Sequence, residues 1–299
     1  MNIIITGGTG FIGTVLCLRL LERKYNIVIL TRHPETIEGD IKGISDLEQI
    51  KGQMSFDVVI NLAGEPIANK RWSRAQQQRI FDSRLETTKK LINYFKSSDK
   101  KPKLLISGSA IGYYGTAESN DGFDEDALGD ESFSSQLCQQ WEAVAFQAQE
   151  LGIRTCTLRT GIVLGKGGGA LKKMLLPFKL GLGGKIGKGS QWMSWIHMDD
   201  LIGIILFSID HDDVDGAVNG TAPNPVTNAH FTKTLGQVLK RPTVLPMPAL
   251  VVKLLMGQMG EELLLAGKKV LPVKIINKGY TFKYEQLQEA LLDATRNVG

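Results

Sequence analysis

The sequence has 299 residues, of which 42% are hydrophobic, so it can form one large globular domain and a smaller appendage. Its net charge of +4, from 35 basic and 31 acidic side chains, includes no sustained basic block, which argues against a nucleic-acid partner. Cys17, Cys138 and Cys156 are far apart, so neither a disulfide framework nor a zinc site is predicted. A strand pattern directly after Met1 leaves no room for a signal peptide, and the longest apolar run, 201–209, is too short to span a membrane. We expect a cytoplasmic protein with no membrane partner.

Runs rich in β-branched residues alternate with helical patterns along the first two thirds of the chain, at 2–6, 26–31, 57–62, 103–107 and 153–158. This alternation predicts a parallel sheet. The runs are apolar on both faces, as in Ile3-Ile4-Ile5, which is typical of strands that helices cover on both sides. We therefore expect a doubly wound α/β domain over residues 1–222.

The chain after residue 222 has a different texture, with five prolines between 223 and 248 and no strong strand alternation. Short helical patterns follow one another there, at 228–240, 249–258, 271–277 and 284–296. They predict a small, mostly helical domain over residues 223–299.

A glycine-rich turn, Gly7-Gly8-Thr9-Gly10-Phe11-Ile12-Gly13, joins the first predicted strand to a helix. Its spacing fits G-x-G-x-x-G from Gly8 and also G-x-x-G-x-x-G from Gly7. Glycines at such a turn let the backbone bend sharply and approach a pyrophosphate, whose charge rests on the free N–H groups of the helix start. The turn predicts a dinucleotide site, with contacts from Gly7, Thr9, Gly10, Phe11, Ile12 and Gly13.

The end of the second predicted strand distinguishes the two nicotinamide cofactors. An NAD-preferring site usually has an acidic residue there, which accepts hydrogen bonds from the ribose 2′-hydroxyl. This sequence has Thr31, Arg32 and His33 instead, and a guanidinium can bind a 2′-phosphate through paired, charge-assisted hydrogen bonds. We predict NADP(H) as cofactor, with Thr31 and Arg32 among its contacts; the alternative is a solvated arginine at a strand end.

The residues after the run at 57–62 are expected to line the ligands, because open α/β sheets bind at the carboxyl ends of their strands. Arg71-Trp72 pairs a guanidinium with an indole, which suits a flat or anionic ligand. Arg84 either faces the same cleft or is a surface ion-pair partner. The expected cofactor contacts in this part of the chain are Asn61, Leu62, Ala63 and Gly64.

Several of these stretches resemble the extended short-chain dehydrogenase/reductase superfamily, and in particular its NAD-dependent epimerase/dehydratase group. They are the glycine turn, Asn61 to Gly64, Ser107-Gly108-Ser109-Ala110 and the run from Trp195 to Leu201. Leu62 to Ile67, Arg71-Trp72, Ser83-Arg84, Trp141-Glu142 and Ser194 to His197 resemble more narrowly the atypical "epimerase family" proteins, whose small carboxy-terminal domain of unknown function is similar to 246–294. The resemblance implies a Rossmann-type fold that binds NADP(H), with a carboxy-terminal domain on the substrate side, and it supplies no substrate.

The sequence departs from the superfamily at its catalytic pair. The enzymes of that superfamily use a Ser or Thr together with Tyr-x-x-x-Lys, in which the lysine lowers the pKa of the tyrosine. Ser109 matches the serine, but Leu137 and Trp141 fall at the tyrosine and lysine positions by register, and neither can transfer a proton. Tyr113 and Tyr114 are candidate acids in their place, with Glu65 or Arg84 as a charged helper; the alternative is that these tyrosines are packing elements or pocket walls.

Two further segments are candidate parts of a substrate cleft. Lys166 lies in a glycine-rich stretch, 165–170, which is a mobile flap, an anion-binding helix start or a plain connector. Trp192 precedes His197, for which no second ligand follows at metal-site spacing, so we expect no metal. The expected substrate contacts are Glu65, Arg71, Trp72, Arg84, Tyr114, Lys166 and Trp192.

Two hypotheses of different classes follow. The first is an NADP(H)-dependent oxidoreductase or epimerase-like enzyme acting on a small molecule, a nucleotide sugar or a carbonyl compound, with Ser109 orienting the reacting oxygen. The second is an NADP(H)-binding regulator or scaffold without turnover, which the missing Tyr-x-x-x-Lys pair favours. A homodimer is compatible with either.

Overall fold

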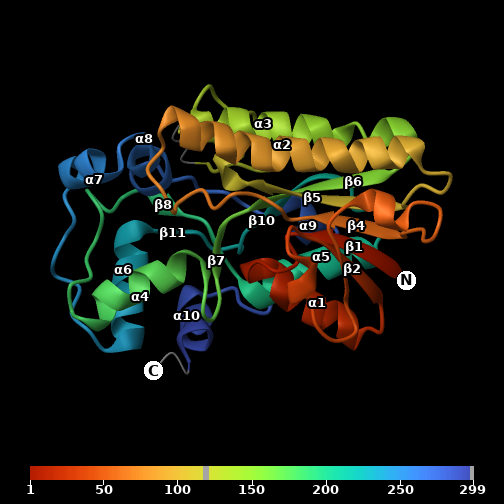
Figure 1. Ribbon diagram of the computed structural model, residues 1–299. Coiled ribbons are helices and arrows are strands. Elements are labelled where there is room, and N and C mark those ends of the chain that lie inside the picture. The colour runs from red at the N-terminus through yellow and green to blue at the C-terminus, as the bar shows by residue number, and fades with distance from the viewer. Residues whose placement is uncertain (117–120, 297–299) are drawn as a thin grey trace.

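The computed structural model describes residues 1–116 and 121–296 (Figure 1). Its strands are β1 (Asn2–Thr6), β2 (Asn26–Leu30), β3 (Lys42–Ile44), β4 (Val58–Asn61), β5 (Leu104–Ala110), β6 (Arg154–Thr160), β7 (Ile162–Leu164), β8 (Trp192–Met193), β9 (Trp195–His197), β10 (Gly216–Gly220) and β11 (Val226–Thr227). Its helices are α1 (Phe11–Glu22), α2 (Arg74–Ser97), α3 (Phe133–Phe146), α4 (Gly169–Lys179), α5 (Met198–Asp210), α6 (Asn228–Leu239), α7 (Ala249–Met256), α8 (Gln258–Gly260), α9 (Val273–Asn277) and α10 (Leu287–Thr295).

Seven parallel strands form the main sheet, in the order β10-β6-β5-β4-β1-β2-β3. The chain starts in the middle of this sheet, at β1, and the strand order reverses between β1 and β4. A reversal of this kind leaves a crevice at the carboxyl ends of the two strands, because their following segments leave in opposite directions. The fold is the predicted Rossmann-type doubly wound sheet.

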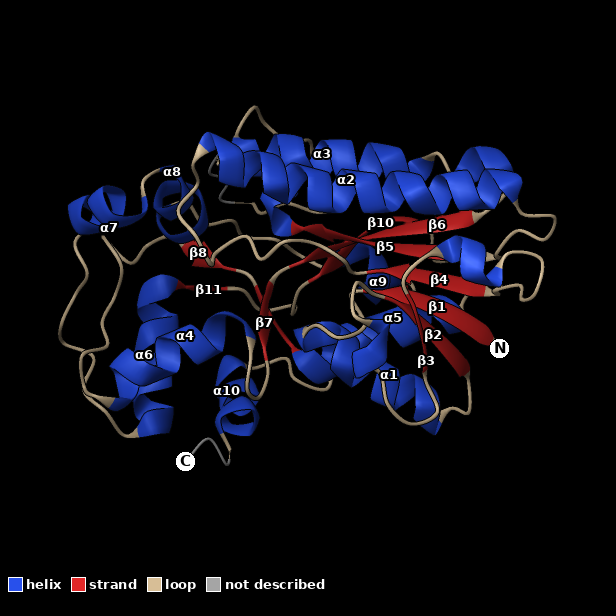
Figure 2. Cartoon of the chain, viewed as in Figure 1, coloured by secondary structure: helices blue, strands red, loops and turns tan. Residues whose placement is uncertain are grey.

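The alternation of side chains along each strand divides the core between the two faces of the sheet. Ile3 and Ile5 face α1 and α5 and pack against residues such as Leu16. Ile4 faces α2 and α3, where Phe95 belongs to the same buried cluster. Figure 2 shows α2 and α3 as one layer above the sheet and α1 and α5 as another below it. Strands covered in this way must be apolar on both sides, as the sequence of β1 is.

A third apolar cluster lies beyond the carboxyl edge of the sheet. It joins α4, α6 and α10 to β7 and β9, with Leu171, Trp195, Phe231 and Leu291 fully buried. We call these elements, together with α7, the second lobe. These helices stand to the left of the sheet in Figure 1. Among the described residues, no helix combines the length and the apolar character that crossing a membrane requires.

Between α6 and α10 the chain returns to the main sheet and to α5. Asn219 of β10 donates a hydrogen bond from Nδ2 to the carbonyl of Leu271, at 2.9 Å. Asp200, which is buried near the start of α5, accepts hydrogen bonds from the backbone N–H groups of Lys283 and Tyr284, at 2.7 and 2.9 Å. These contacts fix the path of the residues that lead into α10.

Some elements differ from their predicted bounds. β5 extends to Ala110, so Ser109 lies inside the strand, because β6 continues the parallel ladder alongside it and pairs Ser109 with Arg159. β3 and the short strands from β7 to β11 were not predicted, since runs of two to five residues carry little periodicity. α7 ends at Met256, before Gly257 with its φ of +57°.

Candidate functional site

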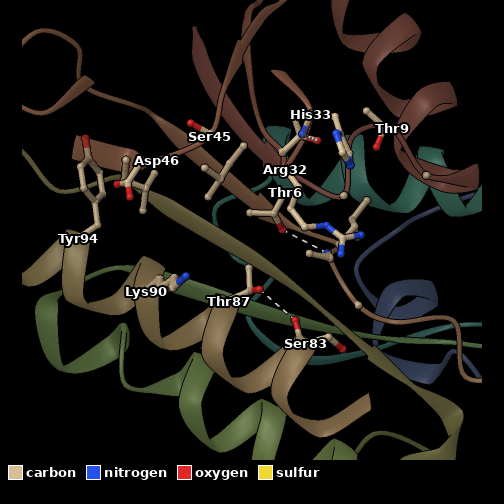
Figure 3. Close-up of a pocket in the computed structure, with 18 of the residues that line it drawn as sticks. Thr6, Thr9, Arg32, His33, Ser45, Asp46, Ser83, Thr87, Lys90 and Tyr94 are labelled. Atoms are coloured by element: carbon tan, nitrogen blue, oxygen red, sulfur yellow. Dashed lines mark hydrogen bonds between the residues drawn. The ribbon is translucent and has the colours of Figure 1, made fainter. Parts of the chain in front are cut away.

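A cleft of about 910 Å³ opens at the carboxyl edge of the sheet, where the strand order reverses (Figure 3). The turn after β1 and the end of β2 form one side of it, and α2 forms the other. The lining residues are Thr6, Gly7, Thr9, Gly10, Leu30, Thr31, Arg32, His33, Ser45, Asp46, Leu47, Glu48, Leu62, Ala63, Gly64, Glu65, Pro66, Ser83, Thr87, Lys90, Asn93, Tyr94 and Ser97.

The glycines of the turn after β1 are required by close backbone contacts. A Cβ on Gly7, whose φ is +71°, would lie 2.7 Å from the carbonyl carbon of Leu62. A Cβ on Gly13 would lie 2.2 Å from the carbonyl oxygen of Gly7. Gly10 is the N-cap of α1, and no side chain of the described residues accepts from the first N–H groups of that helix. The turn therefore presents free donors at a positive helix end, beside a backbone that a ligand can approach closely.

The far side of the turn carries Phe11, which explains the role of a second glycine-rich segment. Cβ atoms built on Gly165, Gly168 and Gly169 would lie 3.0, 2.1 and 2.9 Å from the Phe11 ring. The segment after β7 thus packs on the start of α1. Ile12 packs against the core below the turn.

The end of β2 gives the cleft a basic side. Thr31 donates its backbone N–H to the carbonyl of Ile44, and its hydroxyl accepts from the N–H of His33. Arg32 and His33 are exposed at the cleft, opposite Lys90 and Tyr94 of α2 (Figure 3). No carboxylate follows directly on β2, as the sequence analysis expects for a site that accepts a 2′-phosphate.

The end of β3 contributes residues to the cleft that the sequence analysis did not predict. Ser45, Asp46 and Glu48 follow β3, and Asp46 accepts the backbone N–H of Glu48 through one carboxylate oxygen, at 2.9 Å. The strand before them has three residues, too few for a recognisable pattern.

Asn61 fixes the edge of the sheet and does not line the cleft. It is fully buried and accepts a hydrogen bond from the hydroxyl of Thr6 at 2.6 Å. Its amide nitrogen donates to Thr88 and Ser107. Leu62, Ala63 and Gly64, which follow it, do line the cleft.

Arg84 supports this loop from below. Its guanidinium donates to the carbonyl of Glu65 at 3.0 Å and lies 5.2 Å from the centre of the Trp141 ring. Burial lowers the pKa of Arg84. A Cβ on Gly64 would lie 2.9 Å from the guanidinium carbon, so Arg84 holds the backbone of the loop and is separated from the cleft by it.

A buried polar network lies along β5 and β6. Ser109 donates its hydroxyl to Glu142 Oε1 at 2.6 Å, and Arg159 binds both oxygens of Glu142, at 2.9 and 3.0 Å. Arg159 also donates to the hydroxyl of Tyr114, which donates to Asn219. Burial alone would lower the pKa of Arg159, but its hydrogen bonds and charge pairing with Glu142 raise it well above its usual range.

The residues of α3 that reach Ser109 lie one position beyond the predicted pair. Leu137 packs in an apolar cluster with Trp72, and the indole N–H of Trp141 donates to Thr88. The residues at the serine are Cys138 and Glu142, four positions apart on one face of the helix. Burial raises the pKa of Cys138 to about 11, so it stays a thiol at neutral pH. No Tyr-Lys pair faces Ser109 in the described chain.

The two tyrosines after β5 differ in their surroundings. Tyr114 is buried with its hydroxyl engaged on both sides, and burial raises its pKa. Tyr113 is half-buried, its ring stacks 3.4 Å from the guanidinium carbon of Arg159, and no described residue hydrogen-bonds to its hydroxyl. Of the two, Tyr113 has the free phenol.

The remaining predicted substrate residues do not gather at one place. Trp72 is buried against Phe133, with ring centres 4.7 Å apart, and donates its indole N–H to Ile67. Arg71 is exposed beside Gly257. Glu65 lines the cleft. The other two are Lys166, 3.6 Å from Asp293 of α10, and Trp192, which lies below the ammonium of Lys269 at 5.5 Å.

Lys173 of α4 ties the second lobe to the loop after β4. Its ammonium donates to the carbonyl of Ala68 at 2.7 Å and to the side chain of Asn69 at 2.8 Å. The sequence analysis did not single out this lysine, because its partners lie more than a hundred residues away. Among the described residues, no group of three or more His, Cys, Asp and Glu side chains could hold a metal ion.

Comparison with known proteins gives this geometry a family. Residues 3–219 match the model of the NAD dependent epimerase/dehydratase family, which is most of the chain. The chain belongs to that family. Residues 247–294 match a domain of unknown function, DUF1731, in agreement with the resemblance found in the sequence.

Similar proteins extend over the whole chain. The human epimerase family protein SDR39U1 is 39% identical over 297 residues, which cover 97% of this chain and 98% of the human one. A chloroplastic homologue from Arabidopsis thaliana is 38% identical and covers 97% of this chain and 86% of its own. A crystal structure of the human protein, solved with NADPH, matches 100% of both chains with a TM-score of 0.88 and 36% identity.

The ion pair between Glu142 and Arg159 generates a prediction on stability. Replacing Glu142→Gln leaves the Arg159 guanidinium buried without its counter-charge, so the free energy of unfolding should fall by about 3 to 5 kcal/mol. Urea unfolding followed by circular dichroism measures the change. The matched control is Glu86→Gln, which removes an exposed pair with Lys89 and should change stability by less than about 0.5 kcal/mol. Equal effects in the two variants would contradict a structural role for the buried pair.

Proposed function

We propose that this protein is an NADP(H)-dependent oxidoreductase or epimerase-like enzyme that acts on a small carbonyl compound, alcohol or nucleotide sugar. The cleft supports NADP(H) as the cofactor, because it has a glycine cradle at the start of α1 and Arg32 and His33 at the end of β2. The human relative crystallised with NADPH supports the same choice.

The residues present fit a dinucleotide. Gly7 and Gly13 have no room for a Cβ, which lets the turn and the start of α1 pack closely on the sheet, and the uncapped start of α1 supplies N–H donors for a pyrophosphate. Arg32 would bind the 2′-phosphate, with Thr31 and His33 beside it. Leu62, Ala63 and Gly64 would line the inner half. When bound, the cofactor supplies hydride exchange with a substrate carbon.

Two side chains, Ser109 and Tyr113, would act on a substrate oxygen next to the cofactor site. The hydrogen of the Ser109 hydroxyl is held by Glu142, so the lone pairs of Oγ are free to accept a hydrogen bond from a substrate alcohol. Arg159 binds both oxygens of Glu142 and holds this carboxylate in place, which fixes the direction in which the Ser109 hydroxyl donates. The free phenol of Tyr113 is the candidate group for proton exchange, and the stacked guanidinium fixes the plane of its ring.

The second candidate function is an NADP(H)-binding regulator without turnover. The absence of a Tyr-Lys pair facing Ser109 in the described chain favours it, and so does the engagement of both Glu142 oxygens by Arg159. The two functions share the cofactor site. They differ only in whether hydride is transferred between the bound cofactor and a substrate.

Arg32 provides the test of the cofactor. Arg32→Ala should weaken NADPH binding by about 10- to 100-fold, since it removes charge-assisted hydrogen bonds to the 2′-phosphate, and should leave NADH binding nearly unchanged. Titration by nicotinamide fluorescence measures both affinities. The matched control is Lys42→Ala, an exposed cation on the neighbouring β3 that does not line the cleft. If Arg32→Ala weakens NADPH and NADH equally, the assignment of NADP(H) is wrong.

Turnover distinguishes enzyme from regulator. We expect wild-type protein to oxidise NADPH with at least one member of a panel of aldehydes, ketones and keto-sugars, and Tyr113→Phe to lower kcat by about 100-fold or more with little change in NADPH affinity. The fall in absorbance at the band of the reduced nicotinamide measures the rate of NADPH oxidation. Tight NADPH binding without turnover across the panel would favour the regulator, and full activity in Tyr113→Phe would remove the tyrosine from the reaction.

A further inference from the structure

Exposed aliphatic side chains lie on α4, on α7 and on the loops beside them. Figure 1 shows α4 and α7 to the left of the sheet. On α7, Leu250, Leu254 and Leu255 are 68%, 67% and 68% exposed. We name this region the leucine surface. Its members are Leu176, Leu180, Leu182, Val244, Leu245, Met247, Leu250, Val251, Leu254 and Leu255.

The segments that carry these side chains lie against one another. Ile186 and Met247 form a parallel bridge, and the backbone N–H of Met247 donates to the carbonyl of Lys185 at 2.9 Å. A Cβ on Gly184 would collide with the carbonyl of Leu245. The stretch after α4 and the stretch before α7 therefore run side by side, which brings their leucines to one end of the molecule. Of the eight residues of α7, only Val252 is buried.

The same region carries an unusual charge distribution. Residues 161–198 and 216–260 contain ten lysines and arginines and no aspartate or glutamate. The remainder of the chain holds 25 of the 35 basic residues and all 31 acidic ones. The segments that carry the leucine surface are thus cationic in a chain whose other parts are net acidic. Among these ten residues, Lys166 pairs with Asp293 of α10 and Lys253 with Glu261, at 3.6 and 2.8 Å.

A small cavity of about 350 Å³ borders the leucine surface at Val244. Lys185 and Lys233 lie on its walls with the hydroxyl-bearing Thr232 and Thr243. Neither lysine forms an ion pair with a described residue, and both are exposed. Two ammonium groups and two hydroxyls around one hollow suit a phosphate-bearing headgroup.

We propose that the leucine surface docks onto membranes that contain anionic phospholipids. Aliphatic side chains on a short helix and its neighbouring loops would enter the boundary between headgroups and acyl chains, while the surrounding lysines attract the anionic headgroups. A second copy of the chain is the less favoured occupant, because a two-fold contact through this surface would bring its lysines against the same lysines of the other copy. Docking of this kind needs no membrane-spanning segment, so the shortness of the apolar runs in the sequence does not oppose it.

This inference is independent of the proposed function. No residue of the leucine surface lines the nucleotide cleft, so variants in the surface should keep their NADPH affinity. Docking would hold the protein at a lipid surface by one end of the second lobe.

Co-sedimentation of the full chain with vesicles tests the proposal. We expect binding to vesicles of phosphatidylcholine and phosphatidylglycerol, weaker binding to phosphatidylcholine alone, and release as the salt concentration rises. The double variant Leu250→Gln with Leu254→Gln should lower the partition coefficient by about tenfold or more, since two aliphatic side chains no longer leave water. Lys185→Gln with Lys233→Gln should remove the preference for phosphatidylglycerol.

Matched controls are Leu128→Gln, whose side chain is 83% exposed outside the surface, and Lys100→Gln, an exposed lysine of the acidic part. Thermal unfolding of each variant, expected to match wild type, shows that the fold is retained. The proposal is overturned if wild-type protein does not bind the anionic vesicles, or if the surface and control variants bind alike. Concentration-dependent dimerisation that the leucine variant abolishes, without vesicle binding, would assign the surface to a second copy instead.

Discussion

The close approach of three backbone segments at the glycine turn determines much of what this structure can do. Gly13 touches the carbonyl of Gly7, and Gly7 touches the backbone of Leu62, so α1 starts directly above the end of β4. Only glycine permits distances this short. The contact places the positive end of α1 at the point where the strand order reverses, and the cleft exists because the chain leaves β1 and β4 in opposite directions there.

The cleft and the buried network stand in contrast. The cleft has exposed, adaptable groups such as Arg32 and Lys90, which a ligand can recruit with little reorganisation. The network around Glu142 is buried and held by an ion pair and hydrogen bonds, so its members are fixed before any ligand arrives. Ser109 belongs to this network, and Glu142 sets the direction of its hydroxyl.

Local signals in the sequence predicted the parts of the fold that depend on neighbouring residues. The sequence predicts the glycine turn, the apolar strands and the basic end of β2 at Arg32, because each depends on backbone geometry or charge at one place in the chain. Signals were absent where partners are distant. In the sequence, Arg159 is one residue of an apolar strand, and nothing near it indicates that α3 brings Glu142 into contact with it. In the same way, the role of Lys173 depends on its contact with Asn69, which is distant in the sequence. The predicted register of α3 was one residue off because helical periodicity alone does not say which residues of an apolar helix meet Ser109.

The central claim is that the cleft beside the glycine turn binds NADP(H). Hydrogen–deuterium exchange of wild-type protein with and without NADPH tests it most directly, because it locates the ligand without assuming a reaction. The account predicts slower exchange on NADPH addition in 7–16, 30–34 and 62–66, and a smaller effect of NADH at 30–34. Unchanged exchange in these three segments at a saturating NADPH concentration, or protection confined to other parts of the chain, would contradict it.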